Sequence, residues 1–203
     1  MSSQIAKFIA RVAENLPDMS SDIMQGWIDN PKGLQKFLLG LCPPADVPEL
    51  PQLLRKIATV SVSGVKNFVA KDHLKDANVG WTGDNFKKLF FGNVEKNVEA
   101  ITVAIHRLEQ LSLDPPIMAQ LADHTEISLA HFFELLKKQS KGEDGVFLIN
   151  GYANIAYIKG SDGNLWAVSA GWGSGSRCWD VGARSVEDPD RWRGGCQVLS
   201  RDS

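Results

Sequence analysis

The side chains that could do chemistry in this 203-residue chain are its cysteines, histidines and clustered acids. The three cysteines, Cys42, Cys178 and Cys196, are odd in number and form no Cys-x-x-Cys pair, and the four histidines are scattered without a His-Glu-x-x-His motif. Disulfide frameworks and zinc sites need such regular spacing. The sequence therefore favours neither, and we expect no metal and no cofactor.

Two other patterns resemble catalytic sites only weakly. The acidic run Glu187-Asp188-Pro189-Asp190 could supply a general acid and base, although an exposed turn explains it better. The segment 173–177, GSGSR, resembles a phosphate-binding loop but lacks the Lys-Ser/Thr pair that follows such a loop. We therefore expect a protein that is not an enzyme.

The C-terminal stretch 172–201 has the most regular pattern in the chain. Trp179, Val181 and Ala183 alternate with Asp180 and the small or polar residues that follow it. Side chains two residues apart on a strand share one face, so this alternation predicts a strand with an apolar inner face and a polar outer face. The residues expected to form the scaffold are Trp172, Trp179, Val181, Ala183, Trp192 and Val198.

Small, polar and charged residues fill the positions between the scaffold residues. All fourteen lysines lie at or before Lys159, whereas five of the eight arginines lie after it. Arginine is the cation most suited to recognition surfaces, because its planar guanidinium donates several hydrogen bonds and stacks on aromatic rings. An ordinary arginine-rich surface over a tryptophan core explains the composition equally well. The predicted ligand-binding face comprises Gly173, Gly175, Ser176, Cys178, Asp180, Gly182, Arg184, Asp188, Asp190, Arg191, Arg193 and Cys196.

Charge and hydropathy exclude several classes of partner. The formal net charge is −2, so no concentrated basic patch for nucleic acid is expected. The N-terminal residues 1–16 lack the apolar core and cleavage site of a signal peptide, and no apolar run is long enough to cross a membrane. We expect a cytoplasmic protein with neither a nucleic-acid partner nor a membrane segment.

The first half of the chain predicts a helical unit and a connecting region. Apolar spacing predicts helices over 3–16, over a short stretch capped by Ser20 or Ser21, and over 31–42. These helices form an N-terminal unit, residues 1–45, that could dock or form a homo-oligomer. Residues 46–98 are expected to be a linker and a small α/β segment, with a strand at 60–63 and a helix at 84–91.

Residues 99–203 are expected to form one α+β domain with helices packed on a small twisted antiparallel sheet. Residues 99–108 are rich in β-branched side chains, although a helix over 94–111 remains an alternative. Asp114 is expected to cap a helix, and Thr125 with Ser128 to open another that ends at Gly142. The remaining predicted strands are 146–149, 154–159, 165–170, 179–184 and 197–201.

The spaced pattern W…W-x-V-x-A-x-S-V-x-x-P-x-x-W-x-x-G-x-Q-V-x-S-R, which begins at Trp172 and ends at Arg201, is similar to a known family. It resembles the C-terminal variable region of the target proteins of diversity-generating retroelements, which have a C-type-lectin-like fold. The preceding segment, NGYANIAYIKGSDGNLWAVSAGW, also resembles the strands that lead into that region. The resemblance covers roughly residues 125–203, with a variable region at about 171–203.

The resemblance implies a mechanism for the irregular face. In this family a reverse transcriptase copies a template with errors at adenines, and the copy replaces the variable region. Template AAY codons can become codons for Gly, Ser, Asp, Arg and Cys but not for Lys, and the segment after Lys159 contains no lysine. Glu187 departs from this pattern, because Glu cannot be reached from AAY.

The resemblance thus implies a binding protein whose C-terminal face is varied to change the recognised ligand, which we expect to be a macromolecule, specifically a protein. Two alternatives remain. One is an enzyme similar to the formylglycine-generating oxidases, which would use Cys178 and Cys196. The other is a structural protein that oligomerises through its N-terminal helices.

Overall fold

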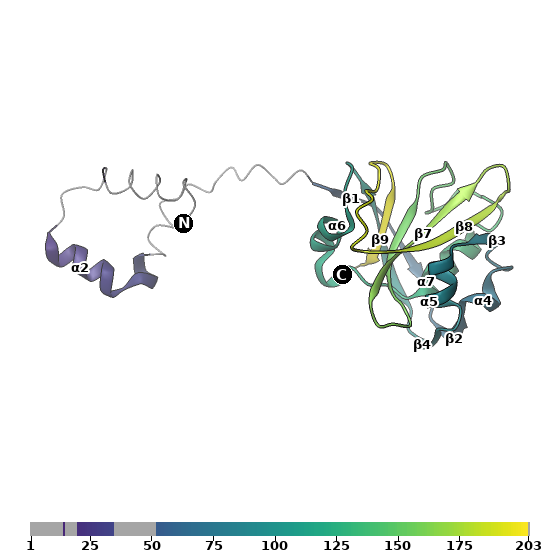
Figure 1. Ribbon diagram of the computed structural model, residues 1–203, viewed down its shortest axis with the longest axis horizontal. Helices are drawn as coiled ribbons and strands as arrows, with labels where there is room; N and C mark the ends of the chain where they lie inside the picture. Colours follow the sequence, from purple (N-terminus) through teal and green to yellow (C-terminus); the bar gives the residue numbers. More distant parts are fainter. Residues whose placement is uncertain (1–13, 15–19, 35–51, 203) are drawn as a thin grey trace. The chain divides into compact units, whose positions relative to one another are not determined.

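The computed structural model describes residue 14 and residues 20–34 and 52–202 (Figure 1). The chain divides into two compact units, Met1–Leu50 and Pro51–Ser203. In the first unit, helix α2 (Ser21–Asp29) begins after Ser20, whose hydroxyl accepts a hydrogen bond from the Ile23 amide. The predicted capped helix is therefore confirmed. Residues 31–34 are also helical, whereas the predicted helix 3–16 and the rest of 31–42 lie outside the described residues apart from residue 14.

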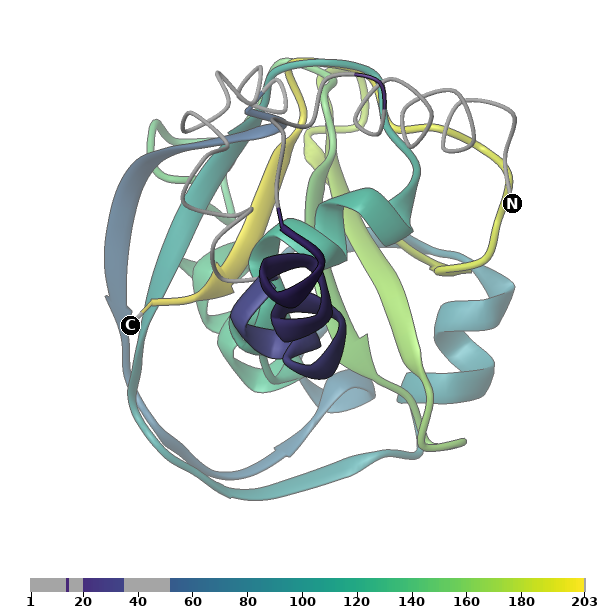
Figure 2. The ribbon, with the colours of Figure 1, turned by 90° about the vertical axis from the view of Figure 1, so that its left-hand side faces the viewer.

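The second unit is built on a seven-stranded mixed sheet with the order β1-β5-β9-β6-β7-β8-β3. Neighbouring strands are antiparallel except for two parallel pairs, β6 with β9 and β3 with β8. Figure 2 shows β1 in blue, β5 in teal and β9 in yellow running side by side. The strands are β1 (Leu54–Val62), β3 (Val79–Thr82), β5 (Ile101–Leu108), β6 (Asn154–Lys159), β7 (Leu165–Gly173), β8 (Cys178–Ser185) and β9 (Gln197–Arg201).

This sheet corrects two expectations. The sheet is larger than expected and is not purely antiparallel. The region 46–98 is also not a separate segment, because β1 pairs with β5 along its whole length and β3 pairs with β8. The second unit therefore begins near residue 51 and not at residue 99. Strand β5 also settles the choice between strand and helix at 99–108.

The mixed α+β class is confirmed, with helices covering both faces of the sheet. Helices α5 (Asp84–Phe90) and α7 (Leu129–Lys138) contribute phenylalanines to a large core on one face, and α6 (Asp114–Leu121) packs on the other (Figure 1). Two buried faces explain why residues 154–158 of β6 are all buried, because such strands lack a solvated side. The remaining elements are β2 (Val65–Val69) and β4 (Val94–Val98), which pair in a small second sheet, the short helix α4 (Ala70–His73) and the turn η1 (Ala122–His124).

At residues 179–181 the inner and outer faces of β8 agree with the predicted alternation, whereas Gly182, Ala183 and Arg184 are all half-buried. Trp179 and Val181 have no exposed surface and pack in the core beside α7. Asp180, between them, is exposed on the opposite side of the sheet. Ser128 caps α7 as predicted, since its hydroxyl accepts the His131 amide at 3.2 Å.

The predicted strand 146–149 is wrong. Phe147 is buried, but its backbone pairs with a side chain and not with a neighbouring strand: its amide donates to Gln139 Oε1 at 2.8 Å, and its carbonyl accepts from Gln139 Nε2 at 3.1 Å. An apolar run indicates burial, but it does not by itself indicate that a strand lies alongside.

Candidate binding face

The outer residues of β8 face the same side of the sheet as α6. Strand register places Gly182 and Arg184 on this side with Asp180, and it places Trp81 of β3 opposite Asp180. Trp81 is 57% exposed, an unusual state for so large an apolar side chain. This part of the face therefore presents Gly182 beside one exposed indole ring, with a ring atom of Trp81 4.0 Å from where a Cβ of Gly182 would lie.

The connection between β8 and β9, residues 186–196, crosses this side of the sheet. Its middle is tied to the segment before α6 by a two-hydrogen-bond bridge between Ser112 and Trp192, with N–O distances of 3.0 and 2.7 Å. Its far end reaches Ala153, whose carbonyl accepts the Gln197 amide at 2.9 Å. An irregular segment is thus held at both ends and in the middle, which lets its other side chains face solvent without loosening the fold.

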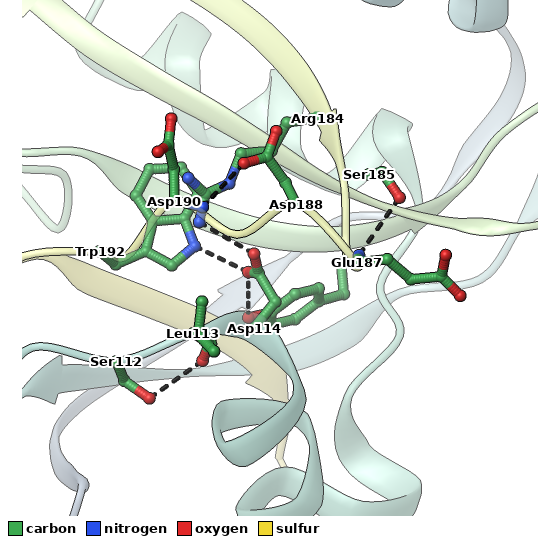
Figure 3. A network of polar contacts seen from close by, with 10 residues as sticks. Ser112, Leu113, Asp114, Arg184, Ser185, Glu187, Asp188, Asp190 and Trp192 are labelled. Carbon is green, nitrogen blue, oxygen red and sulfur yellow. Dashed lines mark hydrogen bonds and ion pairs between the residues drawn. The ribbon is translucent and has the colours of Figure 1, made fainter.

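A buried carboxylate anchors that crossing segment (Figure 3). Asp114 is fully buried, and its Oδ1 accepts hydrogen bonds from Tyr157 Oη at 2.8 Å and Trp192 Nε1 at 2.7 Å. Its Oδ2 accepts a hydrogen bond from Arg184 Nη2 at 2.9 Å. The Arg184 guanidinium carbon lies 3.6 Å from the centre of the Trp192 ring, so the two side chains are stacked. Burial and the Asp114 charge raise the pKa of Tyr157, which keeps the phenol protonated as a donor.

This cluster corrects two predictions. Asp114 is the first residue of α6, whose N-cap is Leu113, and its carboxylate faces inward and does not cap the helix. Arg184 was expected on the outer face, but only 19% of its side chain is exposed. One physical reason explains both corrections: a buried carboxylate needs hydrogen-bond donors and a positive partner. Arg184 supplies one donor and the positive charge to Asp114 from strand β8.

A pocket of about 600 Å³ opens between the crossing segment, Arg184 and the loop 150–153. Asp190, Arg191 and Arg193 are exposed and line it. Cys196 also lines it but is only 4% exposed, and burial raises the pKa of its thiol. Cys196 was predicted as a surface residue, and this prediction is wrong because its side chain packs in the apolar cluster under α6.

A second pocket, of about 500 Å³, adjoins the first and shares Asn150 and Tyr152 with it. Gly195 also lines it, with a φ of +98°. A side chain there would be strained by the backbone, and its Cβ would lie 2.9 Å from the Tyr152 ring. Glycine at this position therefore lets the crossing segment pack closely against Tyr152.

Two buried amides position the loop 150–153. The Asn154 side chain is fully buried; it accepts the Leu148 amide at 2.8 Å and donates to the carbonyls of Leu148 and Ala170 at 3.0 and 3.2 Å. Gln139 holds Phe147 in the same way. These contacts satisfy the backbone of an irregular segment that the sheet does not pair, and so fix one wall of both pockets.

The other predicted face residues lie elsewhere or are partly covered. Gly173 and Cys178 pair at the last step of the β7–β8 ladder, and Gly175 and Ser176 lie in the exposed turn between them. This turn is at the opposite end of β8 from Arg184. Asp188 is half-buried, and its Oδ1 accepts the Asp190 amide at 2.9 Å. The structure thus brings together Arg184, Asp190, Arg191, Arg193 and Cys196 at one pocket, and it separates them from the residues of the turn.

Sequence analysis did not identify Trp81, Asn150 or Tyr152 as part of the face. Tyr152 is 41% exposed and stands between the two pockets. An Asn-Gly turn at 150–151 was a local signal for a loop, but nothing local placed this loop beside residues 190–196. Trp81 reaches β8 only through a parallel pairing across about a hundred residues of chain, which sequence patterns do not reveal.

A third pocket, of about 300 Å³, lies on the other face of the sheet at the start of α7. The Glu95 carboxylate already accepts the amides of Leu129 and Ala130 there, at 2.9 and 2.8 Å. The helix end is therefore satisfied by the protein itself.

Within residues 20–34 and 52–202, no three metal-ligating side chains cluster as a metal site would need, and both described cysteines are free. No helix in the described part of the chain is long and apolar enough to cross a membrane. Comparison of the chain with models of known families, with curated proteins and with solved structures found no significant match.

Proposed function

We propose that this chain is a ligand-binding protein whose C-terminal surface is diversified by a retroelement to change the recognised ligand. The crossing segment 186–196 and the outer face of β8 form the binding surface. The scaffold is C-type-lectin-like, and it holds that surface without depending on its exposed side chains. The ligand is a protein.

The observation that carries the proposal is the separation of scaffold from surface along one short segment. Trp179, Val181 and Val198 have no exposed surface. Positions between them, such as Asp180 and Arg191, are exposed, and their side chains make no hydrogen bond or ion pair with the described residues. A surface of this kind can accept many side chains at small cost in stability, as substitutions at exposed sites away from special contacts usually do.

Trp192 contributes to this separation as an anchor within the variable segment. Its indole is held by Asp114, while Arg191 and Arg193 on either side point into solvent and line the 600 Å³ pocket. Fixed aromatic anchors beside adaptable polar positions are also the arrangement of antibody recognition loops.

The oxidase-like alternative is less well supported. A nucleophilic thiol needs a lowered pKa and access, whereas burial raises the pKa of Cys196. Cys178 lies at the opposite end of β8 from the pocket that Cys196 lines. Replacing each cysteine by serine would abolish activity in such an enzyme, but we expect both variants to fold and to keep ligand binding.

Sequencing the DNA that flanks the gene, together with the 3′ end of the gene in many cells, tests the proposal directly. We expect a nearby near-copy that differs at adenines, a reverse transcriptase gene, and variation concentrated at exposed positions such as Gly175, Ser176, Asp180, Asp190, Arg191 and Arg193. Trp179, Val181 and Val198 serve as internal controls and should not vary. An invariant tail without a second copy, or variation spread equally over buried positions, would contradict the proposal.

A further inference from the structure

We propose that, in this chain, the two adjoining pockets form one groove that binds an extended acidic segment of a protein ligand. The inference rests on the proposed function and adds the chemical class of the partner. The two pockets adjoin at Asn150 and Tyr152, which line both. A ligand lying along them would pass over the Tyr152 ring.

The charge around the first pocket favours a carboxylate. Arg184, Arg191 and Arg193 line it against a single acid, Asp190, in a chain whose net charge is −2. Arg191 and Arg193 make no ion pair with any described residue, and both are exposed. The carboxylate of Asp114 neutralises the charge of Arg184, so the attraction for a carboxylate ligand comes from Arg191 and Arg193. Guanidinium groups bind carboxylates through short, charge-assisted hydrogen bonds.

The second pocket continues this character. Arg107 lines it, is exposed and has no ion-pair partner among the described residues, whereas Glu109 beside it is already paired with Arg55 at 2.6 Å. Ile57, 43% exposed, offers an apolar contact at the edge of the sheet. A segment with acidic side chains spaced along it would meet arginines in both pockets.

Two buried polar atoms of these lining side chains, Arg184 Nε and Gln197 Oε1, have no hydrogen-bond partner among the described residues. Each belongs to a side chain that lines one of the two pockets, and Gln197 is only 7% exposed. Unsatisfied buried groups commonly mark positions that a bound water or ligand completes. The two side chains line different pockets, and this observation is independent of the charge argument.

The probe is a pair of blocked peptides, acetyl-tetraglutamate-amide and acetyl-tetraglutamine-amide, titrated into the full-length protein and followed by amide and indole NMR shifts. We expect tetraglutamate to shift Trp192, Tyr152 and Ile57 and to bind more weakly as salt is raised. Tetraglutamine should leave these signals unchanged. Equal binding of both peptides, or shifts confined to the first pocket, would overturn the acidic-groove proposal.

The matched variants each remove one positive charge, from different places. Arg191→Ser and Arg193→Ser, made separately, should each raise the dissociation constant of tetraglutamate by about tenfold or more, since each removes a charged hydrogen bond. Arg177→Asn is the control, because Arg177 is exposed in the turn at the other end of β8 and its φ of 52° suits asparagine. An equal loss in the control would overturn the assignment of the site.

The peptide titration and the gene sequencing can fail independently of each other. Gene copies that vary at exposed positions, combined with a protein that ignores tetraglutamate, would retain the diversified surface and remove the acidic ligand. Tetraglutamate binding with an invariant gene would retain the groove and remove the diversification.

Discussion

Replacing Asp114 by asparagine should destabilise the second unit, although the change adds no volume. Tyr157 and Trp192 both donate to Oδ1, while Arg184 donates to Oδ2. An asparagine that keeps its oxygen toward the first two donors must place its NH₂ group against the guanidinium. The substitution therefore breaks the Arg184 contact and keeps the other two donors paired, with a neutral oxygen in place of a charged one.

The expected cost follows from the burial of the pair. Breaking a fully buried ion pair costs about 3–5 kcal/mol, because the remaining charge is left without a partner. Here Asp114 is fully buried, but 19% of the Arg184 side chain is exposed, so water partly compensates the freed guanidinium. We expect Asp114→Asn to lower the free energy of unfolding by roughly 2–3 kcal/mol.

Urea denaturation of the full chain, followed by tryptophan fluorescence at neutral pH, measures this difference. Asp190→Asn is the matched control: the chemical change is the same, the residue is exposed, and the cost should stay within about 0.5 kcal/mol. In a double-mutant cycle, Asp114→Asn with Arg184→Gln should cost clearly less than the sum of the single variants. Equal stabilities for Asp114→Asn and Asp190→Asn would refute the role given to the buried pair.

Three further predictions test other parts of the structure. Trp179→Ala should lower the free energy of unfolding by about 3–5 kcal/mol, because a fully buried indole is lost. Asp180→Ala, at the exposed position next to it, should change the free energy of unfolding by less than about 0.5 kcal/mol. Equal melting temperatures for the two variants would contradict the inner and outer faces assigned to Trp179 and Asp180. Burial lowers the pKa of His106 below its usual 6.5, so the unfolded chain binds this proton at a higher pH than the folded chain does. The contribution of His106 to stability is complete above pH 6.5 and should be lost as the pH falls below that value. His106→Gln should reduce this part of the pH dependence of the free energy of unfolding in urea, and an unchanged pH dependence would argue against it. In the native protein, iodoacetamide should modify Cys196 much more slowly than Cys178, as peptide mass spectrometry can measure, because Cys196 is buried and its thiol has a raised pKa; equal rates would mean that the crossing segment opens readily.

The sequence by itself determined the features that depend on neighbours within a few residues. The alternation at 179–181 predicted which side chains of β8 are buried there, because successive side chains of a strand point to opposite faces. Ser128 identified the start of α7, and the apolar spacing of Phe86, Leu89 and Phe90 identified α5. The sequence also identified residues 190–193 as polar and irregular around one expected scaffold residue, Trp192.

Only the tertiary structure decided where those local elements meet. Asp114 looked like a helix cap, but its partners Tyr157, Arg184 and Trp192 are 43, 70 and 78 residues away in the chain. An aspartate at the start of a helix can cap the helix or can be a buried acceptor. Only the donors that surround its carboxylate in space distinguish the two roles.

The pairing of strands is likewise not encoded locally. The parallel pairs β6–β9 and β3–β8 join distant segments, and they bring Trp81 beside Asp180 and Cys196 beside Ala153. Hydrophobic period specifies that a strand has a buried face, but the strand beside it is selected by packing over the whole sheet. The sequence therefore predicted an arginine-rich segment beside a strand with a buried face, and the fold decided that Arg184 is held inside while Arg191 and Arg193 are exposed.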